Sequence, residues 1–333
     1  MKILDMHCDT LERLWKSERE GRPISMESNA LQLDFRRMKA SGCAVQNFAV
    51  WVDCGKYEKP MEAYRAMADV FRRHMSDCRR LAAPVRSVRE IRAVHKAGRI
   101  AGMLTVEDGG ILEGDLERLS ELAEDGVRMM TLTWNYNNEL GTAAVKAAEG
   151  DAGLTPLGKA CVERMEELSI IVDVAHLSDQ GIRDVLEVAK KPFAASHSNA
   201  RALCPMARNL PDELLRRLGE RGCVVGLNFF VPFLVRPLPW MTRKRLPAEK
   251  CFTKEQIMEA VVRHAKHLVN VCGSEGVGIG SDFDGIDPNP ALPGCEAFPE
   301  LYDALRRGGV APSQIDRIFY GNAMRLYEEL LPV

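Results

Sequence analysis

Short, nearly continuous apolar runs alternate with helical patterns along this chain, and this alternation is its strongest constraint on the fold. Such β-rich runs, bounded by turns, are typical of strands covered on both faces in a parallel sheet. Eight of them occur, near residues 3–9, 43–51, 99–106, 127–134, 169–175, 192–197, 222–230 and 276–282. The clearest helical patterns between them lie at 60–82, 115–125, 155–168, 178–190, 211–220 and 253–272. Eight strand–helix units predict an α/β fold, a (β/α)8 TIM barrel rather than an open sheet.

The domain organisation expected from this pattern is a single barrel over residues 1–333. A chain of 333 residues with 46% hydrophobic residues can bury one large core, and single barrels of this size are ordinary. The segment 228–252 is long and rich in proline. It is therefore expected to be a loop over the barrel mouth and not a domain boundary.

Charge and cysteine usage exclude several classes of partner. The formal net charge of -2 provides no basic field for nucleic acid or an anionic membrane, and no run approaches the roughly 20 apolar residues that cross a bilayer. The ten cysteines are dispersed, without a Cys-x-x-Cys pair, which indicates reduced thiols in a cytoplasmic protein. No signal peptide is expected, because the given sequence enters its first predicted strand directly. Small-molecule chemistry is favoured, and the oligomeric state stays open, with a homodimer as one alternative.

Polar residues stand where the apolar runs stop. In a barrel of parallel strands, these positions meet at the carboxyl ends of the strands, where active sites lie. They supply three imidazoles and three carboxylates, from His7, Asp9, Glu107, His176, His197 and Asp282. This set is typical of a hydrolase with two metal ions.

Two histidine groups are candidate metal ligands. His7 and Asp9 are two residues apart, so in a strand they would project to one face about 6 to 7 Å apart and could reach one ion. The alternative is a polar strand end whose histidine caps a carbonyl. A lone His176 or His197 would more often be a satisfied core residue, but two histidines at equivalent ends of adjacent strands favour zinc ligands.

The remaining carboxylates have complementary tasks. The two oxygens of Glu107 could bridge two cations, although for this residue in isolation a salt bridge to a neighbouring arginine is the more common role. Asp108 is expected to cap a helix or a loop. Asp282 could bind metal weakly and move protons, while Asp284 shapes the turn. Two divalent cations would balance three carboxylates and one hydroxide. A hydroxide that bridges two metals is a nucleophile near neutral pH, and the metals polarise a carbonyl.

Four other histidines have no predicted role. They all lie in helical stretches, at His74, His95, His264 and His267. The last two share a helix face with basic residues, and this face is expected to be exposed.

The motifs that carry these residues resemble the membrane (renal) dipeptidase family of zinc dipeptidases, peptidase family M19, whose bacterial members are often soluble. The resemblance spans nearly the whole chain, through DMHCDT, TVEDGG, TLTWNYNNELG, DVAHLSD, SHSNAR, ARNLPDELL, GIGSDFDGI and GNAMRLY. It implies a (β/α)8 barrel of the metallo-dependent hydrolase type. It also implies a site with two Zn²⁺ ions that hydrolyses dipeptides, often with a D-residue at the C-terminal position.

The resemblance implies a role for each candidate residue. One zinc would be held by His7 and Asp9, the other by His176 and His197, and Glu107 would bridge both. Asp282 matches the family residue that is proposed to shuttle the proton. Arg208 matches the arginine that grips the C-terminal carboxylate of the substrate, a task that suits the geometry of guanidinium.

One departure from the family concerns substrate binding. Trp134 stands where renal-type members carry a histidine that is proposed to stabilise the tetrahedral intermediate. Tryptophan has one N–H donor and takes no positive charge, so this task would pass to zinc, or to Asn135 or Asn137. Apolar residues at 229–240 are expected to line the pocket, with Trp134 and Tyr136 narrowing it, although such residues can equally serve packing.

Two other functions are less favoured. A barrel hydrolase of the lactonase or amidohydrolase type usually bridges its metals with a modified lysine at the fourth strand, and no lysine ends the run at 127–134. A non-enzymatic barrel would be expected to have lost ligands, whereas all six are present. The expected function is therefore a zinc-dependent dipeptidase in which a metal-bridging hydroxide attacks the peptide bond and Asp282 delivers the proton to the leaving amine.

Overall fold

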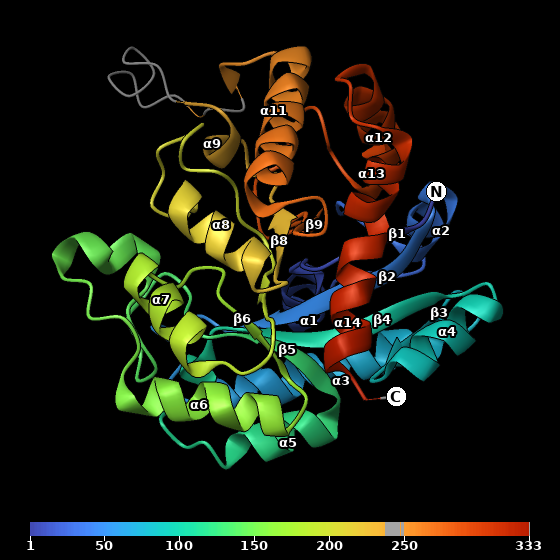
Figure 1. The fold of residues 1–333 in the computed structure, drawn as a ribbon. Helices are drawn as coiled ribbons and strands as arrows, with labels where there is room; N and C mark the ends of the chain where they lie inside the picture. Colours follow the sequence, from blue (N-terminus) through green and yellow to red (C-terminus); the bar gives the residue numbers. More distant parts are fainter. Residues whose placement is uncertain (237–246, 248–249, 333) are drawn as a thin grey trace.

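The computed structural model describes residues 1–236, 247 and 250–332, and its centre is a closed barrel of parallel strands (Figure 1). The sheet order is β2-β1-β9-β8-β7-β6-β5-β4-β3, and an additional pairing between β2 and β4 closes the barrel. The strands are β1 Ile3–Asp5, β2 Cys43–Trp51, β3 Ala82–Val85, β4 Ile100–Glu107, β5 Val127–Thr131, β6 Ile171–Asp173, β7 Ala194–Ala195, β8 Val224–Leu227 and β9 Val277–Ile279. Each of the eight predicted runs overlaps one of the eight barrel strands, and only β4 extends past its run, by one residue, so the predicted barrel is confirmed.

Strand β3 was not predicted. It pairs with the first half of β4, on the edge where β5 pairs with the second half. The helix expected at 60–82 ends at Asp77, and the chain turns through Cys78 and Leu81 into β3. The run of β3 is only four residues long and contains Pro84, which has no N–H to donate to a strand ladder and argues against a strand in sequence.

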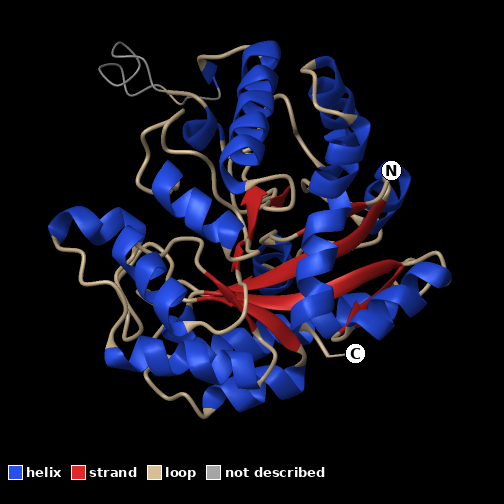
Figure 2. Ribbon diagram, in the orientation of Figure 1, coloured by secondary structure: helices blue, strands red, loops and turns tan. Residues whose placement is uncertain are grey.

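Helices surround the strands on the outside of the barrel (Figure 2). The predicted patterns at 115–125, 155–168, 178–190, 211–220 and 253–272 correspond to α5, α6, α7, α8 and α11. Three of these helices begin at a side-chain N-cap: the side chains of Thr155, Ser178 and Thr253 accept bonds from N–H groups of the first helical turn. The helices are α1 Thr10–Arg19, α2 Phe35–Ser41, α3 Pro60–Asp77, α4 Val88–Lys96, α5 Arg118–Asp125, α6 Pro156–Glu167, α7 Asp179–Val188, α8 Asp212–Glu220, α9 Val231–Leu234, α11 Lys254–Cys272, α12 Phe298–Arg307, α13 Pro312–Asp316 and α14 Asn322–Leu330, with short turns η1 Gly109–Leu112, η2 Ala144–Glu149, η4 Cys295–Ala297 and η5 Arg317–Gly321.

The barrel is closed at one end and open at the other. A cluster of residues from the first halves of the strands, including Leu4 and Met103, packs against Leu326 and Tyr327 of α14. The hydroxyl of Tyr327 also bonds the side chain of Asn47. Strand β4 alternates between this inner cluster and the outer core beneath the helices, and the alternation points its last residue, Glu107, into the open mouth.

The predicted loop at 228–252 is partly described. It contains the short helix α9, and Phe230 and Phe233 line the cavity at the mouth. The rest of the prediction, at 237–246 and 248–249, lies outside the described residues.

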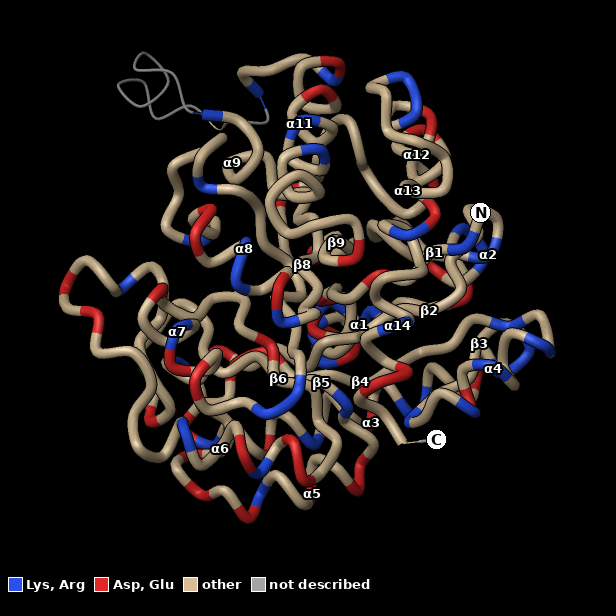
Figure 3. Tube along the Cα trace, in the orientation of Figure 1, with Lys and Arg blue, Asp and Glu red and all other residues tan. Residues whose placement is uncertain are grey.

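The surface carries both signs of charge, and Figure 3 shows Lys and Arg interspersed with Asp and Glu along the outer helices. No helix in the described ranges is both long enough and apolar enough to span a membrane.

The prediction of an exposed face for His264 is wrong. His264 is 1% exposed, because this face of α11 packs against α9 and the loop that follows β7. Its Nδ1 accepts a bond from the N–H of Ala200 at 3.2 Å, and its Nε2 lies 3.1 Å from the carbonyl oxygen of Leu234, to which it donates. Both nitrogens are satisfied by the neutral ring, whereas protonation would set Nδ1–H against the N–H of Ala200.

We expect the free energy of unfolding to decrease as the pH falls from about 6.5 to about 4 because of this histidine. Burial lowers the pKa of His264 to about 4. Between this pH and the ordinary pKa of histidine, His264 is therefore protonated in the unfolded chain but not in the folded chain. The contribution is complete above the ordinary pKa, is lost towards acid pH, and amounts to at most about 3 kcal/mol. Denaturant titrations at a series of pH values measure it. The variant His264→Gln should show a flatter dependence, and an unchanged one would show that His264 is not its source.

Candidate active site and metal centre

All six predicted ligands converge at the open mouth of the barrel. Glu107 ends β4, whereas the other five lie in the loops that follow β1, β6, β7 and β9. Strand β1 ends at Asp5, before both residues, so the argument that His7 and Asp9 share one face of a strand is wrong. Asp9 is instead the N-cap residue of α1, and the turn between strand and helix brings its carboxylate to His7.

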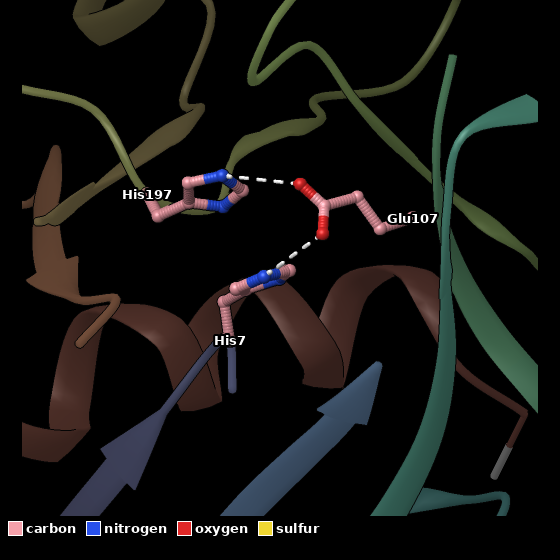
Figure 4. Close-up of side chains that lie close together, drawn as sticks. All are labelled: His7, Glu107 and His197. Carbon is pink, nitrogen blue, oxygen red and sulfur yellow. Dashed lines mark ion pairs between the residues drawn. The ribbon is translucent and has the colours of Figure 1, made fainter. Parts of the chain in front are cut away.

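The Glu107 carboxylate faces His7 with one oxygen and His197 with the other (Figure 4). Its Oε1 is 2.9 Å from Nε2 of His176 and 3.7 Å from Nε2 of His197. Its Oε2 is 3.5 Å from Nε2 of His7. The two nitrogens of His176 and His197 are themselves 3.0 Å apart. One carboxylate oxygen therefore faces a histidine pair, and the other faces His7.

The acidic side chains gather around His7. Its Nε2 lies 3.2 Å from Oδ2 of Asp9 and 3.9 Å from Oδ1 of Asp282. Two groups of three residues present one ligand atom each within 4.8 Å of one another, His7 with Glu107 and His197, and His7 with Asp9 and Asp282. The structure thus brings together the residues that the sequence singled out.

Hydrogen bonds orient the ligand side chains. Nδ1 of His176 lies 3.0 Å from the amide oxygen of Asn135, and Nδ1 of His197 lies 2.8 Å from Oγ of Ser196. Because the amide oxygen only accepts, Nδ1 of His176 carries the hydrogen and Nε2 keeps its lone pair free for a cation. Asn135, which was expected to bind substrate, bonds the ring of the candidate ligand His176.

Two of the candidate ligands have a left-handed backbone. His176 has φ +71° and Asp282 has φ +64°. This conformation is uncommon for residues other than glycine, and it costs on the order of 1–3 kcal/mol where the surroundings enforce it. Strain at two ligand positions is characteristic of a functional site.

The carboxylates share a poorly solvated space. Burial and the neighbouring Glu107 raise the pKa of Asp9 well above its ordinary value, although His7 opposes the shift. Burial raises the pKa of Asp282 to about 6, against the attraction of His7. Burial would also raise the pKa of Glu107, but His7 and His176 hold it well below its usual range. Such a cluster is favourable only when cations compensate the negative charge.

The pKa values of the three imidazoles are also shifted, and not all in the same direction. Burial and Arg208 lower the pKa of His176 to about 4, and burial, His7 and Arg208 lower the pKa of His197 well below its ordinary value. Burial would lower the pKa of His7 too, but Asp9 and Glu107 raise it. His176 and His197 are therefore neutral at physiological pH, the form that binds a metal ion.

The donor set fits divalent metal ions. Oδ1 of Asp9 is buried and has no hydrogen-bond partner among the described residues, although a buried carboxylate oxygen normally has one. Nitrogen ligands from histidine and oxygen ligands from carboxylates are those that zinc accepts. The residues present therefore fit a divalent metal ion, and ligand atoms lie near both oxygens of Glu107.

A cavity of about 540 Å³ opens onto this cluster. Arg208 lines it and is only 5% exposed; its Nε has no partner in the described part of the chain, and its guanidinium lies 5.7 Å from the ring centre of Phe233. Burial lowers the pKa of Arg208 to about 10, so it stays charged at neutral pH. A buried cation with a free donor beside the candidate ligand cluster suits an anionic group of a substrate.

The predicted aromatic wall is confirmed in part. Trp134 and Asn135 line the cavity, and the ring of Trp134 lies 4.8 Å from that of Trp51, which lines it as well. Tyr136 is 42% exposed and is not among the residues that line this cavity, although its ring lies 5.4 Å from that of Trp134, so the prediction that it narrows the pocket is wrong. The side chain of Asn137 accepts a bond from the N–H of Ala143 and lines a separate surface pocket, so it does not face the candidate ligand cluster.

Three residues near the site were not predicted from the sequence. Trp51 is the last residue of β2, and Asn228 follows β8 and donates from Nδ2 to Oδ2 of Asp282 at 3.0 Å. Ser196 precedes His197 and bonds it. Each stands at or just after the carboxyl end of a strand, so applying that positional signal to every residue type, and not only to metal ligands, would have found them.

Comparison with known proteins agrees with this geometry. The model of the membrane dipeptidase family, peptidase family M19, matches residues 1–331. Dipeptidase aclJ of Aspergillus oryzae is 29% identical, over 89% of this chain and 69% of its own length. A dipeptidase AC crystal structure, described as a metallo peptidase of family M19, superposes with a TM-score of 0.87 at 27% identity and covers 100% of this chain and 99% of its own.

A further crystal structure adds a ligand. It is a metallo peptidase from Rhodobacter sphaeroides liganded with a phosphinate mimic of the dipeptide L-Ala-D-Ala; it has a TM-score of 0.86 and 26% identity, and the match covers 99% of both chains. The family match over nearly the full length, the shared barrel and the ligand cluster at its mouth agree, and the chain is a metallo-dipeptidase that belongs to the membrane dipeptidase family, peptidase family M19.

Proposed function

We propose that this enzyme binds two zinc ions and hydrolyses free dipeptides, including those with a D-residue at the C-terminal position. The proposal depends on one observation: one carboxylate oxygen of Glu107 faces the His176–His197 pair, and the other faces His7. A carboxylate placed in this way can bind a cation with each oxygen. The D-residue is suggested by the L-Ala-D-Ala mimic that binds the relative from Rhodobacter sphaeroides.

Each ion would have its own ligands. His7 and Asp9 would hold one, His176 and His197 the other, and Glu107 would bind both. Two zinc ions in such a site supply a nucleophile near neutral pH and polarise the carbonyl of the scissile bond. The protein itself contributes orientation, since Asn135 and Ser196 fix the rings of His176 and His197.

Arg208 would bind the C-terminal carboxylate of the dipeptide. It lies on the His197 side of the cluster, where its Nη2 is 3.4 Å from the carbonyl oxygen of His197. A carboxylate held there would place the peptide carbonyl of a dipeptide over the cluster. A binding site for the free amino terminus would complete the register and exclude longer peptides.

Asp282 would carry the proton to the leaving amine. Its carboxylate lines the cavity and is held by the amide of Asn228, which leaves Oδ1 on the side of His7 and the metal cluster. A positioned carboxyl group within reach of the reacting atoms can take a proton from the attacking water and return it to the departing nitrogen.

Replacing Asp282 by Asn should lower kcat by about 10²- to 10⁴-fold, because an amide cannot transfer the proton. The ligands on both sides of Glu107 remain, so both zinc ions should stay bound. Steady-state kinetics and elemental analysis of the same preparation measure the two effects. Asp303→Asn, on the exposed face of α12, is the matched control. Retention of full turnover by Asp282→Asn would show that another group moves the proton.

The substrate class is tested with a small panel on the zinc-loaded enzyme. Turnover is expected for L,L and L,D dipeptides and not for tripeptides or for dipeptides amidated at the C-terminus. Hydrolysis of lactones or non-peptide amides in place of dipeptides would contradict the proposal and would favour another barrel hydrolase with two metals.

The cellular setting is also part of the proposal. All ten cysteines are free, which supports a reducing compartment and hence the cytoplasm. A homodimer stays a prediction, to be checked by light scattering of the purified protein.

A further inference from the structure

Two buried aspartates outside the candidate ligand set occupy equivalent places in the barrel. Asp5 is the last residue of β1 and Asp173 is the last residue of β6, and both are at most 1% exposed. Asp5 pairs with Ile279 of β9, and Asp173 pairs with Ala194 of β7. Two residues beyond each of these partners stands a serine, Ser281 or Ser196. Each serine directly precedes a candidate metal ligand, Asp282 or His197.

The two aspartates also accept equivalent hydrogen bonds. Oδ1 of Asp5 accepts from the N–H of His7 at 3.4 Å and of Ser281 at 2.9 Å, and Oδ2 accepts from Gln46 Nε2 at 3.0 Å and Ser281 Oγ at 2.6 Å. Oδ1 of Asp173 accepts from the N–H of Ala175 at 3.0 Å and of Ser196 at 2.8 Å, and Oδ2 accepts from Thr131 Oγ1 at 2.7 Å and Ser196 Oγ at 2.5 Å. Each aspartate thus connects the loop after its own strand to the loop after the neighbouring strand, which carries a candidate ligand.

The two arrangements differ in one contact. Ser196 donates its only hydroxyl hydrogen to Asp173, so its oxygen can only accept from Nδ1–H of His197, 2.8 Å away. This contact makes a continuous chain from carboxylate to hydroxyl to imidazole and leaves the lone pair on Nε2, which faces Glu107. Ser281 also donates to its aspartate, but its other hydrogen-bond partners in the described ranges are main-chain groups of His7 and Phe283.

We infer that Asp173 and Ser196 are positioning residues that fix the tautomer and orientation of His197 before a metal ion binds, whereas Asp5 and Ser281 hold only the backbone of their loops. The inference rests on the proposed role of His197 as a zinc ligand. A carboxylate or hydroxyl behind a metal-binding histidine fixes the ring and increases its basicity, and losing such a partner typically lowers metal affinity about 10- to 100-fold.

The two serines provide a matched test, because Ser196→Ala and Ser281→Ala each remove one hydroxyl that donates a hydrogen bond to a buried aspartate. Zinc affinity is measured by competition with a chromophoric chelator, and the thermal midpoint of the metal-free protein reports folding. Ser196→Ala should weaken binding of one of the two ions by about 10- to 100-fold. Ser281→Ala should lower the thermal midpoint by as much as Ser196→Ala does, but with little change in zinc affinity. Ser196→Thr keeps the hydroxyl and should restore affinity. Equal affinities for the two alanine variants would overturn the inference.

A second readout does not depend on metal or on turnover. Nitrogen-15 NMR of the metal-free protein should show His197 as the tautomer with hydrogen on Nδ1 in the wild type and in Ser281→Ala, and a mixture of tautomers in Ser196→Ala. The same mixture in the wild type would also overturn the inference. If the wild type shows the expected tautomer and binds zinc but does not cleave dipeptides, the proposed function fails while this inference stands.

Discussion

Replacing Glu107 by Gln is expected to lower kcat/KM for dipeptides by about 10³-fold or more and to reduce the bound zinc below two ions per chain. The amide keeps the size of the side chain but loses the charge, and only one of its two ends can still bind a cation. Loss of several kcal/mol of metal-dependent stabilisation of the transition state corresponds to this factor. Kinetics and elemental analysis of one zinc-reconstituted preparation measure both effects.

The control for Glu107 is Glu124→Gln, on the exposed end of α5, which should have wild-type activity and zinc content. Two tightly bound ions and normal turnover in Glu107→Gln would contradict the role of this carboxylate. Circular dichroism of both variants separates loss of zinc from loss of the fold.

The second large effect concerns Arg208. Arg208→Met is expected to lower kcat/KM for free dipeptides by about 10²- to 10³-fold, because a buried charge-assisted contact to the substrate carboxylate is lost. The variant should also lose its discrimination between a dipeptide and the same dipeptide with an amidated C-terminus, since neither then meets a cation. Arg208→Lys should recover only part of the rate, because an ammonium group does not form the paired bonds of guanidinium.

Arg216→Met, at an exposed position of α8, is the matched control and should retain full discrimination. If Arg208→Met still prefers the free carboxylate by the wild-type factor, another cation binds the C-terminus of the substrate.

The convergence of the candidate ligands could be predicted because the fold and the site follow one rule. Each barrel strand ends at the same rim, so polar residues that follow apolar runs must meet there, as Glu107 and His197 do. The rule is tolerant of errors in strand length: β9 ends at Ile279 and not at 282, yet Asp282 still reaches the cluster in the loop beyond. Convergence at the mouth depends on the order of the strands and not on their last residue.

Other features depend on contacts that no local pattern records. His264 has the helical spacing of a solvent-facing residue beside Arg263, and only the packing of α9 and the β7 loop on α11 buries it. Tyr136 belongs to the same aromatic segment as Trp134, but the loop turns it outward. Strand β3 forms because the first half of β4 offers a free edge below β5, a tertiary circumstance that is invisible in a four-residue run with a proline.

X-ray diffraction from zinc-reconstituted crystals, recorded at the zinc absorption edge, tests the central claim most directly. Two anomalous peaks are expected at the barrel mouth, one beside His7 and Asp9 and one beside His176 and His197, with Glu107 in contact with both. A single peak, or peaks that do not contact Glu107, would contradict the account.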